Sequence, residues 1–184
     1  MLTKAQTGRE MVFPFFPQGE RLTPFMRACA LWATLEEHDK ILDMACGNGA
    51  LLSFLNDRYR LTLCGMCDSP EQARAVRQRL EDADVISARL EDIPGRGEIF
   101  HAVLLPVLLR GEEMRQALSE AYRVLRPGGQ IVLAARLLPF RSEGELTSRE
   151  TMRLMQEIGF REVSCRAAGL AGAMIGWKRK EMQA

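Results

Sequence analysis

Short apolar stretches alternate with longer amphipathic stretches along most of this chain. The apolar stretches have the length of buried β-strands. In the stretches between them, apolar residues recur every three or four positions, as on one face of a helix. Met114, Leu118 and Ala121 show this helical spacing clearly. We expect strands at about residues 40–44, 60–66, 85–88, 100–105, 130–135, 160–166 and 172–178, and helices at about residues 24–36, 50–55, 70–80, 112–125 and 148–158.

Local signals mark the ends of several of these helices. Thr23-Pro24 and Ser69-Pro70 each combine a residue that caps a helix N-terminus with a proline that fits the first turn. The turn residues Arg126-Pro-Gly-Gly129 are expected to end the fourth helix, and Gly159 the fifth. Near-continuous apolar strands that alternate with helices predict an α/β fold whose parallel sheet is covered on both faces. The short link between the last two strands predicts that they pair antiparallel at an edge.

Composition adds limits to this picture. The chain has 184 residues, 47% of them apolar, with 25 Lys and Arg against 24 Asp and Glu. These values exclude a disordered chain and a generally basic nucleic-acid-binding surface, and leave only a local basic patch open. The basic end at residues 178–180 is more typical of a solvated strand end. We expect one domain over residues 1–184, in which 1–22 form an N-terminal arm or lid and 23–184 the core.

The chain shows no sign of a membrane or secreted protein. No apolar run approaches the roughly 18 residues of a membrane span, and the polar N-terminus lacks the apolar centre of a signal peptide. The five cysteines are scattered and odd in number, which predicts reduced thiols rather than a disulfide framework. We therefore expect a cytoplasmic protein.

A glycine-containing loop, Asp43-Met-Ala-Cys-Gly-Asn-Gly49, follows the first expected strand. In sheets of this kind ligands bind at the carboxyl ends of the strands. Glycine lets the backbone turn sharply and lets a ligand approach it closely, and the next helix offers free N–H groups. A plain strand-to-helix connection also contains glycine, so the loop alone leaves both interpretations open.

Four segments together resemble the class I S-adenosylmethionine-dependent methyltransferases. Ile41–Gly49 resembles motif I of that family, and Arg123–Leu133 resembles the segment leading into its fifth strand. Gly65–Glu71 and Glu91–Pro94 resemble the segments after its second and third strands. The resemblance runs from about residue 22 to the C-terminus. It implies a Rossmann-like, mostly parallel seven-stranded sheet with the last strand antiparallel. It also implies S-adenosylmethionine as cofactor and S-adenosylhomocysteine as product.

The resemblance also implies a set of site residues. Asp43 would orient the glycine loop, and residues 45–49 would pass under the methionine and ribose of the cofactor. The sequence offers no convincing catalytic base, and in-line methyl transfer does not always require one, since it mainly needs donor and acceptor held together. The implied cofactor-binding residues are Asp43, Ala45, Cys46, Gly47, Gly49, Cys67, Asp68, Ser69, Arg89, Leu90 and Leu105.

Several positions depart from the pattern of that family. Ala45 replaces its first glycine, and Cys67 stands where an acid usually accepts the ribose hydroxyls. Asp68 either turns toward the ribose and replaces that acid, or supports the N-terminus of the helix that begins at Ser69-Pro70. Arg89 stands where an acid usually accepts from the adenine amino group, and arginine only donates. It therefore stacks on the ring, binds a phosphate or is solvated. His101 replaces an aspartate and is either a structural residue or a base.

Other chemistries have weaker support. Cys64-Gly-Met-Cys67 has the spacing of a redox dithiol, but Cys64 falls inside a strand and not at a helix N-terminus, where its pKa would be lowered. His38 and His101 have no metal-type spacing with the cysteines, so no metal is predicted. The sequence also lacks a serine-hydrolase elbow, a phosphate-binding loop with lysine and the last glycine of a dinucleotide fingerprint.

Two functions remain as hypotheses. The first is methyl transfer to a small-molecule acceptor, and Asp43, Gly47 and Gly49 favour it. The second is a catalytically inactive, methyltransferase-like binding or scaffold module, which Cys67 and Arg89 favour.

The acceptor side is expected after the fourth and fifth strands, where Pro106, Arg110 and Arg136 lie. Arg136 either pairs with a carboxylate or phosphate of the acceptor or forms an ordinary surface ion pair. The chain lacks a long insertion that would enclose a substrate. This leaves a partner subunit, a homodimer, a large acceptor on an open face, or no acceptor. The apolar residues 11–16 are a lid, a dimer contact or packing against the sheet.

Overall fold

A computed structural model describes residues 22–136, 144–168 and 171–180. The expected arm lies almost wholly outside the described residues. The helices are α1 (Pro24–Trp32), α2 (Ala50–Asn56), α3 (Pro70–Arg79), α4 (Gly111–Val124) and α5 (Ser148–Ile158). The strands are β1 (Lys40–Asp43), β2 (Thr62–Cys67), β3 (Asp84–Ser87), β4 (Phe100–Leu105), β5 (Leu125–Arg136), β6 (Arg161–Ala168) and β7 (Ala171–Trp177).

The capping residues begin the helices where the sequence predicts. The Thr23 hydroxyl accepts from the Met26 N–H at 3.1 Å. The Ser69 hydroxyl accepts from the Gln72 N–H at 3.2 Å. Each of these bonds satisfies a backbone donor that the first helical turn leaves free. The starts of α1 and α3 are therefore confirmed.

The end of α1 differs from the prediction, which extended this helix to about residue 36. Ala33 is already extended, at φ −73° and ψ 128°. The buried side chain of Gln130 in β5 explains the early end. Its carbonyl oxygen accepts from the Thr34 N–H at 3.2 Å, and its amide donates to the Thr34 carbonyl. These bonds replace the ones that another helical turn would make.

The boundary between α4 and β5 also differs from the prediction. Residues 126–129 do not form a separate turn, because β5 already begins at Leu125, opposite Phe100. The register shifts between Phe100 and Ala102, and the Lys178 N–H donates to the Gly129 carbonyl at 2.8 Å. The glycine segment is thus an irregular part of the strand. A Cβ on Gly129 would lie 3.0 Å from the Phe100 carbonyl oxygen.

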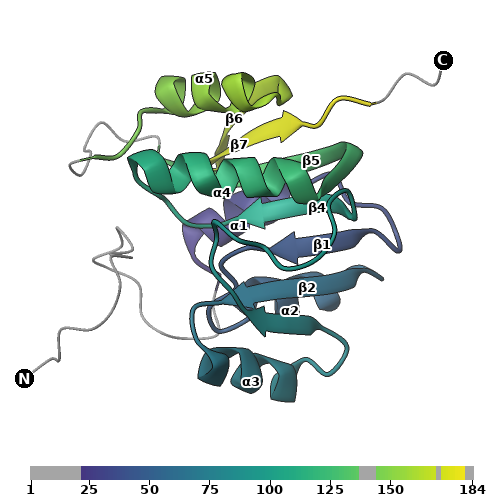
Figure 1. Ribbon diagram of the computed structural model, residues 1–184. Helices are drawn as coiled ribbons and strands as arrows, with labels where there is room; N and C mark the ends of the chain where they lie inside the picture. The colour runs from purple at the N-terminus through teal and green to yellow at the C-terminus, as the bar shows by residue number, and fades with distance from the viewer. Residues whose placement is uncertain (1–21, 137–143, 169–170, 181–184) are drawn as a thin grey trace, which may run out of the picture.

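The sheet has the strand order β3-β2-β1-β4-β5-β7-β6. The first five strands pair in parallel, and β7 runs antiparallel between β5 and β6. Figure 1 shows the heads of β1, β2 and β4 at one edge of the sheet, and β7 pointing the other way. The predicted Rossmann-like, seven-stranded α/β fold is confirmed.

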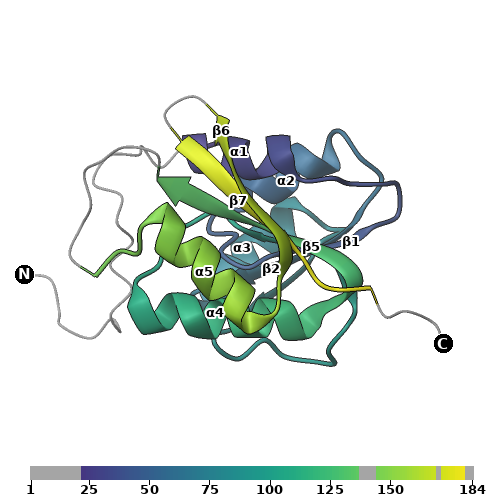
Figure 2. The ribbon, with the colours of Figure 1, turned by 90° about the horizontal axis from the view of Figure 1, so that it is seen from above.

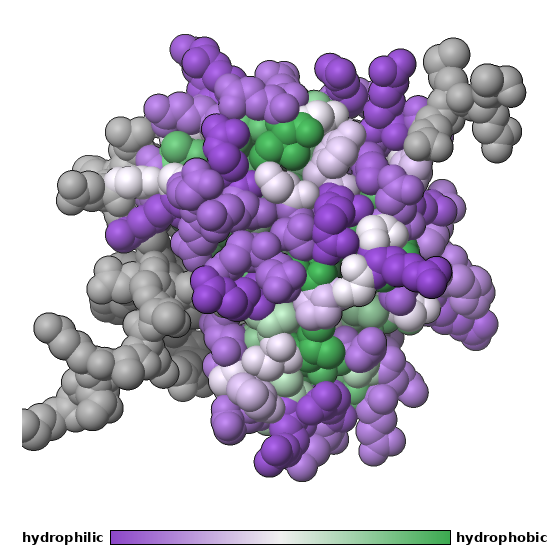
Figure 3. All heavy atoms as spheres, viewed as in Figure 1, coloured by the Kyte–Doolittle hydropathy of each residue, from purple (hydrophilic) through white to green (hydrophobic). Residues whose placement is uncertain are grey.

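Helices cover both faces of the sheet (Figure 2). The α4–α5 face packs Leu118 and Leu154 on inward residues such as Val103. The opposite face packs α1, α2 and α3 on residues such as Leu104. Neighbouring residues of one strand thus enter different cores, as the alternation of side chains along a strand requires. Hydrophilic side chains dominate the outer surface seen in Figure 3, where apolar ones emerge only in small areas.

None of the helices in the described ranges is both long and apolar enough to cross a membrane.

Candidate functional site

The loop after β1 forms a tight left-handed turn. Gly47 and Gly49 have φ values of +50° and +77°, which favour glycine. The Gly49 N–H donates to the Cys46 carbonyl at 2.6 Å, and the Cys46 N–H donates to the Met66 carbonyl of β2 at 2.9 Å. The loop is therefore attached to the neighbouring strand at the edge where β1 and β2 end.

The two glycines have different surroundings. A Cβ on Gly49 would lie 2.7 Å from Cγ1 of Val76 in α3, so this glycine allows close packing of the helix. A Cβ on Gly47 would meet nothing within 4 Å. The backbone at Gly47 therefore faces open space, and a ligand can approach it closely.

Asp43 ends β1 and is fully buried. Its Oδ1 accepts from the Ala45 N–H at 3.1 Å, so it orients the loop. Its Oδ2 is also buried but has no hydrogen-bond partner among the described residues. Burial raises the pKa of this carboxyl to about 7, although the bond from Ala45 acts in the opposite direction. The loop thus covers a buried acceptor that a cationic group of a ligand would satisfy.

Cys67 ends β2 and turns toward the same loop. Its Sγ lies 2.7 Å from Sγ of Cys46 and 3.5 Å from the Gly47 carbonyl oxygen. The contact between the thiols raises the pKa of Cys46 and lowers that of Cys67, while burial raises both. Asp68 follows as an exposed residue, and Ser69 caps α3. The end of β2 therefore places a buried thiol, that of Cys67, against the glycine loop.

The two expected site residues after β3 differ in burial. Leu90 is buried, whereas the side chain of Arg89 is 74% exposed and pairs with Glu91. The Ala88 N–H donates to the Cys67 carbonyl at 3.3 Å, so this segment lies next to the end of β2. Leu105 at the end of β4 is fully buried in the core.

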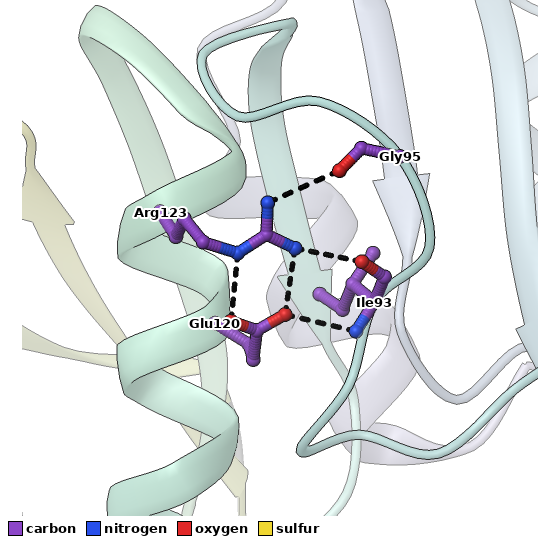
Figure 4. Close-up of polar contacts among 4 residues, drawn as sticks. All are labelled: Ile93, Gly95, Glu120 and Arg123. Atoms are coloured by element: carbon purple, nitrogen blue, oxygen red, sulfur yellow. Dashed lines mark hydrogen bonds and ion pairs between the residues drawn. The ribbon is translucent and has the colours of Figure 1, made fainter.

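A clamp made of Glu120 and Arg123 holds the segment after β3 against α4 (Figure 4). Arg123 donates to the Ile93 carbonyl at 2.7 Å and to the Gly95 carbonyl at 3.2 Å. Glu120 accepts two bonds from Arg123, each at 2.7 Å, and one from the Ile93 N–H at 2.9 Å. The guanidinium lowers the pKa of Glu120. Both segments resemble the family in sequence, but their contact could not be predicted from the sequence.

His101 lies away from this edge, near the start of β4. Its Nδ1 accepts from the Lys40 N–H at 3.1 Å, and its Nε2 lies 3.4 Å from Oδ1 of Asp39. These contacts join the amino ends of β1 and β4, opposite the glycine loop. The structure therefore supports a structural role for His101 rather than a role as a base.

On the acceptor side, Arg110 and Arg136 both contact residues 144–145. Arg136 pairs with the buried Glu145 at 3.1 Å, and Arg110 forms a short backbone bridge with the same residue. The Nε atoms of both arginines are buried and have no hydrogen-bond partner in the part of the chain that the structure describes. Pro106 is buried in the loop that joins β4 to α4 and also carries Arg110. In the described residues, no group of three or more metal-binding side chains occurs.

The glycine loop, β2, β4 and most of β5 fall in one matched segment. A family model described as a methyltransferase domain matches residues 42–133. The chain belongs to this methyltransferase family. The resemblance of the four sequence segments to S-adenosylmethionine-dependent methyltransferases is thereby confirmed.

Two curated relatives of this methyltransferase domain carry the same enzyme name. The demethylmenaquinone methyltransferase of Chlorobaculum tepidum is 26% identical over 136 residues, which are 73% of this chain and 53% of that protein. The enzyme of the same name from Chlorobaculum parvum is also 26% identical, with the same coverage. The chain spans about half the length of these curated relatives.

Solved structures share the fold at low identity. A putative methyltransferase of Haloferax volcanii, in complex with the Trm112 activator, has a TM-score of 0.69 at 15% identity and covers 85% of this chain and 89% of that one. Human N-acetylserotonin methyltransferase in complex with S-adenosylmethionine also has a TM-score of 0.69, at 19% identity, and covers 84% and 52%. The [4+2]-cyclase SpnF has the same TM-score at 13% identity and covers 84% and 80%. The fold alone therefore does not fix the reaction.

Proposed function

We propose that this methyltransferase domain transfers a methyl group from S-adenosylmethionine to a small-molecule acceptor. The observation that carries the proposal is the buried, unpaired Oδ2 of Asp43 beneath a glycine loop that is open at Gly47. An ammonium group next to Asp43 would satisfy this oxygen. The methionine part of S-adenosylmethionine carries such a group, so the residues present fit this cofactor.

Most of the expected cofactor residues gather at one edge of the sheet. Asp43 and residues 45–49 would hold the methionine part, and the ends of β2 and β3 would meet the nucleoside. When bound, S-adenosylmethionine supplies a methyl group activated by its sulfonium. The chain then has to orient donor and acceptor and exclude water, and proximity of this kind supplies much of the rate. We identify no base. The proposed cofactor-binding residues are Asp43, Ala45, Cys46, Gly47, Gly49, Cys67, Asp68, Ser69, Arg89, Leu90 and Leu105.

The acceptor side is proposed beyond β4 and β5, next to Pro106, Arg110 and Arg136. The buried Nε donors of Arg110 and Arg136 have no partner among the described residues, although the Arg136 guanidinium also pairs with Glu145, and they favour an acceptor with a carboxylate or phosphate. The relatives named above support a small molecule, because demethylmenaquinone and N-acetylserotonin are small molecules, but they do not agree on one acceptor. We propose a single domain over residues 1–184 and a cytoplasmic location, which agrees with five free cysteines.

One observation favours a second candidate function. A thiol at Cys67 and an exposed, ion-paired Arg89 stand where the family uses acids, so the nucleoside end has few polar side-chain acceptors. An inactive binding or scaffold module would need no such acceptors, because it does not bind the nucleoside. A partner subunit fits either function, and the Haloferax volcanii relative was solved with an activator protein. A second copy of this chain is the alternative partner.

Calorimetric titration separates the two functions. Purified protein is titrated with S-adenosylmethionine and S-adenosylhomocysteine, with NAD as the control ligand. The proposal predicts that both sulfur nucleosides bind at micromolar strength and that NAD does not. A folded protein that binds neither at millimolar concentration would favour the scaffold module.

A further inference from the structure

The contact between Cys46 and Cys67 brings two buried thiols together in the glycine loop. The Sγ atoms are 2.7 Å apart, and a disulfide bond is about 2.05 Å long, so closing the bond requires a shift of well under an ångström. Both residues belong to the core on the α1–α3 face of the sheet, whereas Cys64 belongs to the core on the other face. The loop cysteine, and not Cys64, is therefore the partner of Cys67.

The surroundings give the two thiols different reactivity. The bond to Cys46 lowers the pKa of Cys67, and the positive charge of Arg77 acts in the same direction, against burial and the charges of Asp43 and Asp68. The same bond raises the pKa of Cys46, and burial adds to this effect. Since the thiolate is the reactive form, Cys67 is the nucleophile and Cys46 the thiol that resolves the intermediate.

We propose that Cys46 and Cys67 form a redox modification site, which hydrogen peroxide converts into an intramolecular disulfide and small thiols convert back. Both thiols are almost fully buried, so the oxidant has to be small. The Cys67 sulfur attacks one peroxide oxygen, the O–O bond breaks, and the departing hydroxide takes up a proton as water. The Cys46 sulfur then displaces hydroxide from the resulting sulfenic acid, and its own proton leaves with that hydroxide as a second water. Two thiols lose two electrons in total, and one peroxide gains them.

The oxidised pair changes the loop on which the cofactor is proposed to lie. The Cys67 thiol can no longer donate to the Gly47 carbonyl, and the bond ties the loop to the end of β2. This part rests on the proposed function: a nucleoside over Gly47 and Cys67 would shield the thiols from peroxide.

Peptide mapping tests the site. The reduced full chain is treated with hydrogen peroxide, its remaining thiols are alkylated in denaturant, and it is digested with trypsin without reductant. Trypsin leaves Cys46 in residues 41–58, and Cys64 and Cys67 together in residues 61–74. We expect a joined peptide pair that forms before Cys165 is oxidised, although Cys165 is the more exposed thiol. A reducing agent should separate the pair.

Variants and ligand decide the outcome. Cys67→Ala and Cys46→Ala should abolish the joined peptides, and Cys64→Ala, the matched control, should leave them unchanged. A link within residues 61–74, or oxidation of Cys165 first, overturns the site. Saturating S-adenosylhomocysteine at about a hundred times its Kd should slow the linkage by roughly 100-fold, since about 1% of molecules are then ligand-free. Binding without protection overturns the shielding but not the site. Absence of binding overturns the proposed function and the shielding, while the linkage result still stands.

Discussion

The two ends of the candidate cofactor site differ in how the chain builds them. At the end of β1 the backbone forms most of the candidate site, because Gly47 and Gly49 adopt left-handed conformations over the buried Asp43. At the ends of β2 and β3 the family relies on acidic side chains, and this chain has Cys67 and the exposed Arg89 instead. We infer that the methionine end carries the binding energy and the nucleoside end contributes shape.

The largest effect is expected at Gly49. A Cβ there would collide with Val76, and alanine would have to adopt an unfavourable positive φ. Gly49→Ala should therefore lower the free energy of unfolding by about 2–4 kcal/mol. Gly47→Ala has open space around it and should cost only about 1–2 kcal/mol. Urea denaturation measures both, and the double variant Gly49→Ala/Val76→Ala should recover part of the loss. Equal losses at the two glycines would contradict this account of the loop.

Asp43 is expected to make the stability of the folded protein depend on pH. Its pKa is raised from 3.8 to about 7, so between these values the folded protein holds a proton that the unfolded chain has released. Stability should therefore fall as the pH rises from about 4 to about 7, and the loss persists above pH 7. Asp43→Asn should remove this slope and raise stability at pH 8 by on the order of 2–4 kcal/mol. Urea denaturation at several pH values measures it, and an unchanged slope would show that Asp43 does not titrate in this range.

The clamp between α4 and the segment after β3 is expected to have a moderate effect. Arg123→Met removes the bonds to the Ile93 and Gly95 carbonyls and leaves Glu120 without its cation, so it should cost about 1–2 kcal/mol. Arg115→Met on the same helix is the matched control, because the side-chain ion pairs of Arg115 with described residues are exposed. This substitution should cost less than about 0.5 kcal/mol. Thermal unfolding compares the stability of the two variants. Similar losses of stability would show that the clamp does not stabilise the fold.

The smallest effect is expected at Arg89. Its side chain is 74% exposed and pairs with Glu91, so Arg89→Ala should change the affinity for S-adenosylhomocysteine by less than about threefold. A much larger loss, measured by calorimetry, would show that Arg89 contacts the nucleoside and would overturn the comparison between the two ends.

Local patterns predicted most of the fold. Hydrophobic periodicity gave the strands and helices, and the capping residues Thr23 and Ser69 gave two helix starts, because both signals act within a few residues. The end of α1 was wrong, since it depends on Gln130, far along the chain. The extra residues of β5 were missed for a similar reason, because the pairing of Gly129 with Lys178 overrides a turn-like sequence.

The site was predictable only where it depends on the backbone. Asp43 ends the first strand and the two glycines lie between it and the next helix, which places them at the carboxyl edge of the parallel sheet from sequence alone. The partner of Cys67 was not predictable from spacing, which suggested Cys64. Residues three apart on a strand point to opposite faces, so only the fold could bring Cys46 to Cys67. The clamp at Arg123 likewise joins segments that only the fold brings together.

The central claim is that the Asp43 carboxylate and the glycine loop hold the ammonium group of the cofactor. Its most direct test is calorimetric titration of the wild type and Asp43→Asn with S-adenosylhomocysteine at pH 7.5 and pH 5.5. Since the Asp43 pKa is about 7, the wild type should bind on the order of 20-fold more weakly at the lower pH, while the weaker binding by Asp43→Asn should not change with pH. Equal affinity of the wild type at both pH values, or no binding by a folded protein, would contradict the claim.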